Sequence, residues 1–270
     1  MPEPRKLMAL LAHPDDEALG IGGTLAKYAA EGVETYLVTA TRGERGWQGA
    51  EHENPGLSAL GSIREAELRG AVAALGIREL HFLDYIDGDL DQADPAEAIA
   101  KIAAHLRRIK PHVVLTFGPA GAYGHTDHIA ICQFTTAACV AAANPSYGVT
   151  GDLAPHAVAK LYYMTISRAL ADAYTAVFGN IVMHFDGVAR TVVIDEDWAI
   201  TTRLDTSAYE DTVWKAVFCH TSQLPSYSRL EQVPEQYRKV IWSEETYYRA
   251  FSLVNGGRVI ERDLFEGLRQ

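Results

Sequence analysis

The sequence predicts a single-domain α/β protein with a Rossmann-like, three-layer fold, in which helices cover both faces of a mostly parallel sheet. Short apolar runs alternate with longer amphipathic segments through the first half, the pattern of βαβ units. The chain has 270 residues, 48% of them apolar, which is enough to enclose one sizeable core. We expect one domain over residues 1–270, with a Rossmann-like core that carries the metal motifs in 1–145 and additional strands, a helix and substrate-side elements in 146–270.

Four strands and four helices are expected in the first half. Short apolar runs predict strands at 7–12, 34–40, 79–83 and 112–117. Apolar residues at helical spacing, such as Leu68, Val72 and Leu75, predict helices at 17–31, 62–76, 95–110 and 127–143.

The second half is less regular. We expect strands at 160–166 and 191–194 and a helix at 207–220. Two long connections, 42–61 and 144–156, are candidates for lids or binding loops because long loops in compact domains are often functional.

Composition excludes several classes of protein. The 35 acidic residues outnumber the 24 basic ones, and a net charge of −11 argues against a nucleic-acid partner. No apolar run approaches the roughly 20 residues of a membrane span. The apolar run near the N-terminus is too short for a signal peptide, and three cysteines in apolar or helical stretches indicate buried thiols. We therefore expect a cytoplasmic protein.

The first chemically distinctive segment is AHPDDE at residues 12–17, between the first expected strand and the first expected helix. Open α/β sheets place their sites at the carboxyl ends of strands, where this segment lies. Three consecutive acids place like charges together, which costs energy unless a cation is present. The segment therefore predicts a metal-binding loop.

The second distinctive segment is YGHTDH at residues 123–128, after the fourth expected strand. The first and fourth strands of a doubly wound sheet flank the reversal of strand order, so the two segments are expected to meet in one crevice. Two histidines and a carboxylate with an open position are typical of a catalytic zinc site. Neither segment contains a cysteine, which argues against a closed structural site.

Only three protein ligands are needed, and the two segments offer more candidates. His13 and Asp16 are spaced to reach one ion around a turn, which leaves Asp15 as an unligated carboxylate and general base beside a metal-bound water. Of His125 and His128, one would complete the metal site and the other would face the substrate carbonyl. The spacing alone leaves that choice open.

Each segment taken singly also has a structural interpretation. The acids of the first are favourable at a helix N-terminus, and a His-x-x-His pair often arises by chance. Because both segments follow expected strands that the fold brings close together, a metal site is the better interpretation.

The chain also resembles the LmbE/PIG-L family of zinc-dependent N-deacetylases. Members of that family include N-acetylglucosaminyl-phosphatidylinositol deacetylase and the deacetylases of mycothiol and bacillithiol biosynthesis. The resemblance runs in order from residue 7 to 143 and returns at 215–223. It rests on AHPDDE at 12–17, TRGE at 41–44, REAE at 64–67, GHTDH at 124–128 and KAVFCHTSQ at 215–223.

The resemblance implies a role for each residue of the two segments. His13, Asp16 and His128 match the zinc ligands, and Asp15 matches the general base. His125 matches the group that stabilises the oxyanion or protonates the leaving amine.

Four further residues are candidates for binding the substrate. Tyr123 matches a tyrosine near the reacting carbonyl, and Arg64 and Asp87 align with positions that contact the sugar. Arg64 is also suited to an ion pair with Glu67 at the start of its helix. For His220, substrate contact and structural hydrogen bonding are equally open.

The sequence thus predicts a zinc-dependent hydrolase that removes an N-acetyl or other small N-acyl group from an N-acetylglucosamine-type conjugate. A site with two histidines and one aspartate also accepts Fe²⁺ or another divalent ion. The alternatives are an amidase or esterase that acts on a non-sugar N-acyl metabolite, a metallophosphoesterase and a non-catalytic metal-binding protein. The expected partner is a small N-acylated molecule, with no nucleic acid and no membrane span, and a homo-oligomer is compatible with the sequence.

Overall fold

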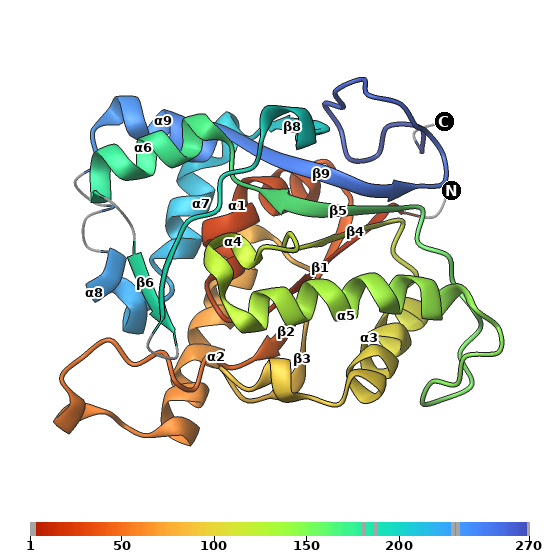
Figure 1. The fold of residues 1–270 in the computed structure, drawn as a ribbon, viewed down its shortest axis with the longest axis horizontal. Coiled ribbons are helices and arrows are strands. Elements are labelled where there is room, and N and C mark those ends of the chain that lie inside the picture. The colour runs from red at the N-terminus through yellow and green to blue at the C-terminus, as the bar shows by residue number, and fades with distance from the viewer. Residues whose placement is uncertain (1–3, 180–181, 186–187, 228–229, 231–232, 269–270) are drawn as a thin grey trace.

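A seven-stranded sheet forms the centre of the computed structural model, which describes residues 4–179, 182–185, 188–227, 230 and 233–268 (Figure 1). The strands along the chain are β1 (Lys6–Leu11), β2 (Glu34–Thr41), β3 (Glu79–Tyr85), β4 (Val113–Thr116), β5 (Lys160–Thr165), β6 (Val182–Phe185), β7 (Val188–Thr191), β8 (Thr202–Asp205) and β9 (Glu244–Ser252). The sheet order is β3-β2-β1-β4-β5-β9-β8. The first five strands in this order are parallel, and β9 and β8 extend the sheet in antiparallel fashion.

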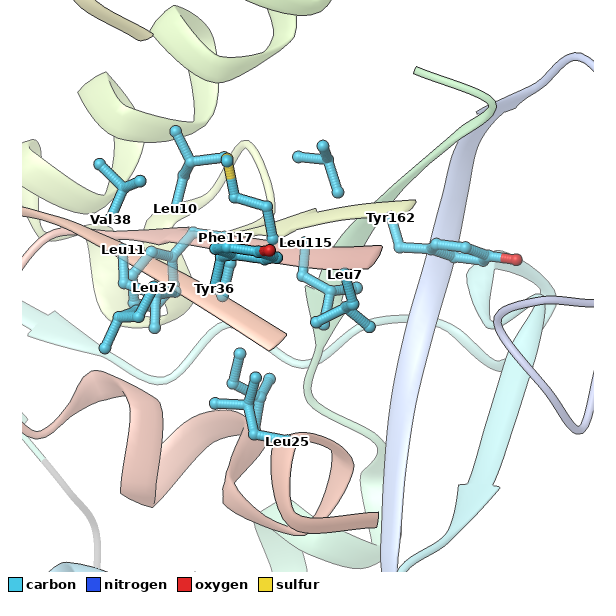
Figure 2. Close-up of a cluster of buried hydrophobic side chains, with 14 of the residues drawn as sticks. Leu7, Leu10, Leu11, Leu25, Tyr36, Leu37, Val38, Leu115, Phe117 and Tyr162 are labelled. Atoms are coloured by element: carbon cyan, nitrogen blue, oxygen red, sulfur yellow. The ribbon is translucent and has the colours of Figure 1, made fainter. Parts of the chain in front are cut away.

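Helices on both faces of the sheet complete a three-layer fold. They are α1 (Asp16–Ala30), α2 (Leu57–Leu75), α3 (Pro95–Ile109), α4 (Gly121–Gly124), α5 (Thr126–Ala143), α6 (Arg168–Phe178), α7 (Glu210–Val217), α8 (Leu224–Tyr227) and α9 (Glu235–Ser243). Helix α1 packs with α2 and α7, and α3 packs with α5. Figure 2 shows α1 and the green helix α5 on opposite sides of the central strands. The expected single α/β fold is confirmed.

The strands expected before residue 170 are confirmed, each to within two residues at either end. The strand expected at 191–194 is wrong. Strand β7 ends at Thr191 and pairs with β6 in a separate hairpin. The apolar residues that follow Thr191 contact α4 instead, since the N–H of Val193 donates to the carbonyl of Ala122 at 2.8 Å.

The helices of the first half are confirmed, although α2 begins at Leu57, so the first long loop is shorter than predicted. The helix expected at 207–220 is only partly correct. A 3₁₀ turn, Ser207–Tyr209, precedes α7, and α7 ends at Val217, before His220. Helix α9 and strand β9 were not predicted, because their aromatic and charged residues follow no clear period.

The core surrounds β1. Its residues from Leu7 to Leu11 have no exposed surface, since β2 and β4 flank the strand and helices cover both faces. Figure 2 shows Leu25 of α1 approaching this layer from one side. Cys132 and Cys139 of α5 are buried thiols as expected, whereas Cys219 is half-buried.

A buried polar cluster around Glu261 joins the C-terminal segment to the sheet. A buried carboxylate is stable only when charges and hydrogen-bond donors surround it. The partners of Glu261 are Lys160 at 2.6 Å, Tyr162 at 2.7 Å, Thr202 at 2.9 Å, Asn255 at 2.6 Å and Arg249 at 2.8 Å.

In the part of the chain that the structure describes, no helix combines the length and the apolar character that crossing a membrane requires.

Candidate active site

The first segment forms a tight turn between β1 and α1. Asp16 is the first residue of α1, and its Oδ2 accepts the backbone N–H groups of Ala12 at 3.1 Å and His13 at 2.8 Å. Asp15 occupies the N-cap position with φ of 104° but makes no side-chain capping bond. The side chain of Asp15 therefore does not cap the helix, whereas Asp16 and Glu17 lie in its first turn.

The second segment lies beside the first because β4 is the direct parallel neighbour of β1. The expectation that the two strands flank the reversal of strand order is confirmed by the sheet order. A glycine is required at Gly121, which has φ of 61° and where a Cβ would lie 2.8 Å from the Ile129 side chain. His125 caps α5, since its Nδ1 accepts the N–H of Asp127 at 3.1 Å.

Donor atoms of His13, Asp16 and His128 converge on one point. Nδ1 of His13 lies 3.2 Å from Nε2 of His128 and 3.7 Å from Oδ2 of Asp16, and Nε2 of His128 lies 3.5 Å from Oδ1 of Asp16. Two ligand atoms bound to one tetrahedral zinc ion lie about 3.3 Å apart. The spacing between these three side chains is therefore close to the spacing between ligand atoms around one ion.

The other ring nitrogen of His13 faces two carboxylates. Nε2 lies 3.0 Å from Asp127 and 3.1 Å from Asp87. Asp127 is fully buried and also accepts the N–H groups of Gly88 at 2.7 Å and Leu90 at 3.1 Å. Burial lowers the pKa of His13, but Asp127, Asp87 and Asp16 outweigh it and raise the pKa well above its ordinary value. With a cation at Nδ1, the proton would stay on Nε2 between these acceptors, and the Nδ1 lone pair would be free to bind the ion.

Two other groups of side chains could hold an ion, and both include His13. One consists of His13, His125 and His128, and the other of His13, Asp87 and Asp127. In the first, Nδ1 of His125 already accepts a backbone N–H, and in the second both oxygens of Asp127 already accept N–H groups. His13 is common to these two groups and to the set of His13, Asp16 and His128.

Burial and charge perturb these groups strongly. Burial raises the pKa of Asp16 to about 7, with Asp15 adding to the effect and His13 opposing it. Burial and the neighbouring His13 lower the pKa of His128 well below its ordinary value. A cation held among the donors would favour a charged Asp16 and a neutral His128, which is the protonation state that ligands need.

The carboxylate of Asp15 lies against Arg64. Nη2 of Arg64 lies 3.0 Å from Oδ2 of Asp15 and also donates to the carbonyl of Pro14, while Nη1 donates to the carbonyl of Gly43 at 3.0 Å. Gly43 has φ of 67°, and a Cβ there would collide with the guanidinium of Arg64. Arg64 is buried, so its contacts in this structure are with Asp15 and the two loops rather than with an exposed surface.

Aromatic rings pack around His128. Phe117 stacks on it with ring centroids 3.8 Å apart, His125 stacks at 4.8 Å, and Tyr123 meets it edge-on at 5.2 Å. Burial and the nearby carboxylates of Asp16 and Asp15 raise the pKa of Tyr123 well above its ordinary value. The phenol therefore keeps its proton, and Tyr123, like His125, lies beside the proposed metal position.

Burial and the neighbouring His13 lower the pKa of His125 to about 4. At neutral pH the ring is therefore uncharged. Because Nδ1 accepts the N–H of Asp127, the proton of the neutral ring resides on Nε2.

The remaining two predicted substrate residues lie inside the protein. Asp87 is buried against His13, and its backbone N–H donates to Glu44 at 3.1 Å. His13 outweighs burial and lowers the pKa of Asp87 to about 2. His220 has no exposed surface, and its Nε2 lies 2.7 Å from Oε1 of Glu17, so it presents no surface to a substrate in this structure.

Sequence reasoning missed Arg190, which lies near the site. Its guanidinium donates to the carbonyl of Gly124, and its charge contributes to the lowered pKa of His125. Arg190 belongs to β7 of the small hairpin, far along the chain from both motifs, and no local pattern singles it out.

Comparison with known proteins agrees with the geometry. Residues 8–139 match the PIG-L family model, described as GlcNAc-PI de-N-acetylase. The chain is 33% identical over 298 residues to the 1D-myo-inositol 2-acetamido-2-deoxy-alpha-D-glucopyranoside deacetylase of Streptomyces griseus subsp. griseus. That alignment covers 98% of this chain and 89% of the relative.

Solved structures share the fold. The N,N'-diacetylchitobiose deacetylase of Pyrococcus horikoshii matches with a TM-score of 0.68 and 20% identity, covering 92% of this chain and 84% of that one. GalB, the 4-carboxy-2-hydroxymuconate hydratase of Pseudomonas putida KT2440, matches with a TM-score of 0.66 and 20% identity, covering 94% and 99%. Since these two proteins are named for different reactions, the fold alone does not decide the chemistry.

Proposed function

The chain belongs to the PIG-L family. We therefore propose that it is a metal-dependent hydrolase that removes the N-acetyl group from an N-acetylglucosamine-type conjugate. The name of the Streptomyces relative, a deacetylase of an inositol-linked 2-acetamido sugar, supports this class of substrate. One observation carries the proposal. Donor atoms of His13, Asp16 and His128 converge, with the carboxylate of Asp15 beside them.

In this proposal His13, Asp16 and His128 hold the ion, zinc in the first instance. When bound, a divalent ion polarises an acyl carbonyl and lowers the pKa of water to about 7. The buried carboxylate of Asp127 orients His13 for this role.

Asp15 acts as the general base. It takes a proton from the attacking water while the water oxygen forms a bond to the acyl carbon. The carbon–nitrogen bond then breaks, and the proton on Asp15 passes to the departing nitrogen. The products are acetate and a free amine. Arg64, whose Nη2 lies 3.0 Å from Oδ2 of Asp15, orients the carboxylate for these steps.

Tyr123 and His125 stabilise negative charge on the acyl oxygen. The phenol keeps its proton, and the neutral ring of His125 carries its proton on Nε2, so both side chains have a donor to offer. Preorganised donors of this kind lower the barrier because they are already oriented when charge develops.

A phosphoesterase with two metals would need an independent second ligand set about 4 Å from the first. Within the described residues, both alternative groups of candidate ligands share His13 with the first site. A mononuclear centre is therefore the better interpretation of this donor set.

The test is an assay of primary-amine release by protein loaded with defined amounts of Zn²⁺ or Fe²⁺. N-acetylglucosaminyl-inositol, N-acetylglucosamine and a non-sugar N-acetyl amine serve as substrates, and p-nitrophenyl phosphate tests the phosphoesterase alternative. We expect one metal ion per chain, release of equal amounts of acetate and amine from a sugar conjugate, and loss of activity with a chelator.

Hydrolysis of the non-sugar amide alone would contradict the substrate class but keep the reaction. Two metal ions per chain with phosphate release would contradict the reaction itself. Tight metal binding without turnover of any substrate would support a non-catalytic metal-binding protein.

A further inference from the structure

The turn at residues 220–223, which joins α7 to α8, contacts three elements of the N-terminal half of the chain. Nε2 of His220 meets Glu17 of α1 at 2.7 Å. The hydroxyls of Thr221 and Ser222 donate to Glu67 of α2 at 2.6 and 2.7 Å. The amide of the next residue, Gln223, donates to the carbonyl of Gly46 at 2.9 Å.

Close packing of α7 on α1 brings His220 to this place. A Cβ at Gly22 would lie 3.2 Å from a methyl group of Val213, so the glycine permits the two helices to approach. His220 and Glu17 then meet without exposed surface on either side chain.

Glu17 divides its two carboxylate oxygens between separate partners. Oε1 faces Nε2 of His220, and Oε2 accepts the backbone N–H of Asp15 at 3.0 Å. The carboxylate is fully buried, so no bulk water replaces a partner that is lost. The position of Glu17 therefore depends on His220, and the backbone of Asp15 depends on Glu17.

Asp15 needs this support because its backbone is unusual. Its φ of 104° lies in the left-handed region, which is unfavourable for any residue with a Cβ and persists only where the surroundings hold it. The same backbone conformation sets the direction in which the carboxylate of Asp15 leaves the chain.

We propose that His220 is a positioning residue for Asp15, which it holds through the carboxylate of Glu17. This inference rests on the proposed function in one respect, namely that Asp15 is the base. Of the two roles that the sequence left open for His220, it assigns structural hydrogen bonding rather than substrate contact. Loss of the ring leaves metal and substrate binding intact and lets the backbone of Asp15 relax.

The test compares His220→Leu, which removes the N–H donor, with His220→Gln, whose side-chain amide can donate to Glu17. His156→Leu is the matched control, because the His156 ring also makes a hydrogen bond, at 2.7 Å to the Pro111 carbonyl, but far from the site. If the Leu variant does not fold, His220→Met serves instead, since its flexible side chain fills the space without a donor.

The first measurement is amide hydrogen exchange at Asp15 by NMR, which needs no substrate. We expect exchange to be at least about tenfold faster in His220→Leu, with the buried amide of Leu10 unchanged and protection restored in His220→Gln. Unchanged exchange at Asp15 in the folded Leu or Met variant would overturn the proposal.

The second measurement is the deacetylase assay with metal analysis. We expect kcat of His220→Leu to fall on the order of 10- to 100-fold while KM and metal content stay within about twofold, and His220→Gln to recover most of the rate. A raised KM at unchanged kcat would assign His220 to substrate contact, and a parallel loss of metal would assign it to the metal site. Either result would overturn the proposal.

The two measurements also separate this inference from the proposed function. If the wild-type protein releases no amine from any substrate, the proposed function fails, while exchange at Asp15 still decides whether His220 holds that residue.

Discussion

The Nε2 atom of His13 lies 3.0 Å from Oδ2 of Asp127, a carboxylate that two further backbone N–H groups hold in place. With a cation bound at Nδ1, this contact would hold the remaining ring proton on Nε2 and keep Nδ1 facing the other proposed ligands. In Asp127→Asn, we expect metal affinity to fall about 10- to 100-fold, because the amide is a weaker acceptor for the ring proton. Competition with a chelating indicator measures the affinity.

Asp152→Asn is the control for this change, since Asp152 is exposed in the loop that follows α5. Equal metal affinity in Asp127→Asn and wild type would mean that His13 is held without this carboxylate.

For Asp15→Asn, we expect a folded protein that keeps one metal ion per chain and loses nearly all turnover. The amide retains the size of the side chain but does not take a proton from water, and general base catalysis contributes roughly 100- to 10,000-fold. Amine release, metal analysis and thermal unfolding are measured together. Substantial activity in this variant would remove Asp15 from the role of base.

For Tyr123→Phe, we expect kcat to fall roughly 100-fold with little change in KM, because a donor to the developing oxyanion is lost. Tyr248→Phe is a suitable control, since Tyr248 lies on β9 and is 38% exposed. If kcat is unchanged and only KM rises, Tyr123 binds the substrate without stabilising the charge.

Stability should depend on pH through Glu261. Its surrounding donors outweigh burial and lower its pKa from 4.5 to about 2. The folded state therefore binds fewer protons than the unfolded state between these values. The stabilisation, roughly 3 kcal/mol, is complete above about pH 5 and is lost as the pH falls towards 2.

In Glu261→Gln, we expect a loss of roughly 3 kcal/mol at neutral pH, because Lys160 and Arg249 lose their buried anion. The decline of stability between pH 5 and pH 3 should also be shallower than in wild type. Urea unfolding at several pH values measures both effects. Glu235→Gln, at an exposed i,i+4 pair with Lys239, is the control, and a wild-type slope in Glu261→Gln would contradict the assignment.

The first half of the fold was predictable because it depends on local patterns. Apolar strands such as β1 and helices of regular spacing are visible in short windows of sequence. Parallel strands bring their carboxyl ends to one edge, so the meeting of the two motifs followed from their placement after β1 and β4. The sequence left open which histidine of the second motif binds metal. The family resemblance chose His128, and in the structure Nε2 of His128 lies 3.2 Å from Nδ1 of His13 while Nδ1 of His125 caps a helix.

The rest depends on contacts that no local spacing encodes. His220 and Glu17 are 203 positions apart, and the hydrogen bond between them appears only when α7 packs on α1. Strand β9 mixes aromatic and charged residues, and its place between β5 and β8 is set by pairing with both. Arg190 reaches the site from a small hairpin whose own sequence carries no motif.

Residue 220 lies late in the chain, so the ribosome synthesises it well after the two N-terminal motifs. The three metal donors have all been synthesised by residue 128, whereas the turn that supports Asp15 follows about ninety positions later and Glu261 later still. A nascent chain therefore contains all three proposed metal ligands long before it contains His220, the proposed support of Asp15. If His220 holds Asp15 as proposed, full activity requires the last quarter of the polypeptide, which is made after the proposed metal ligands.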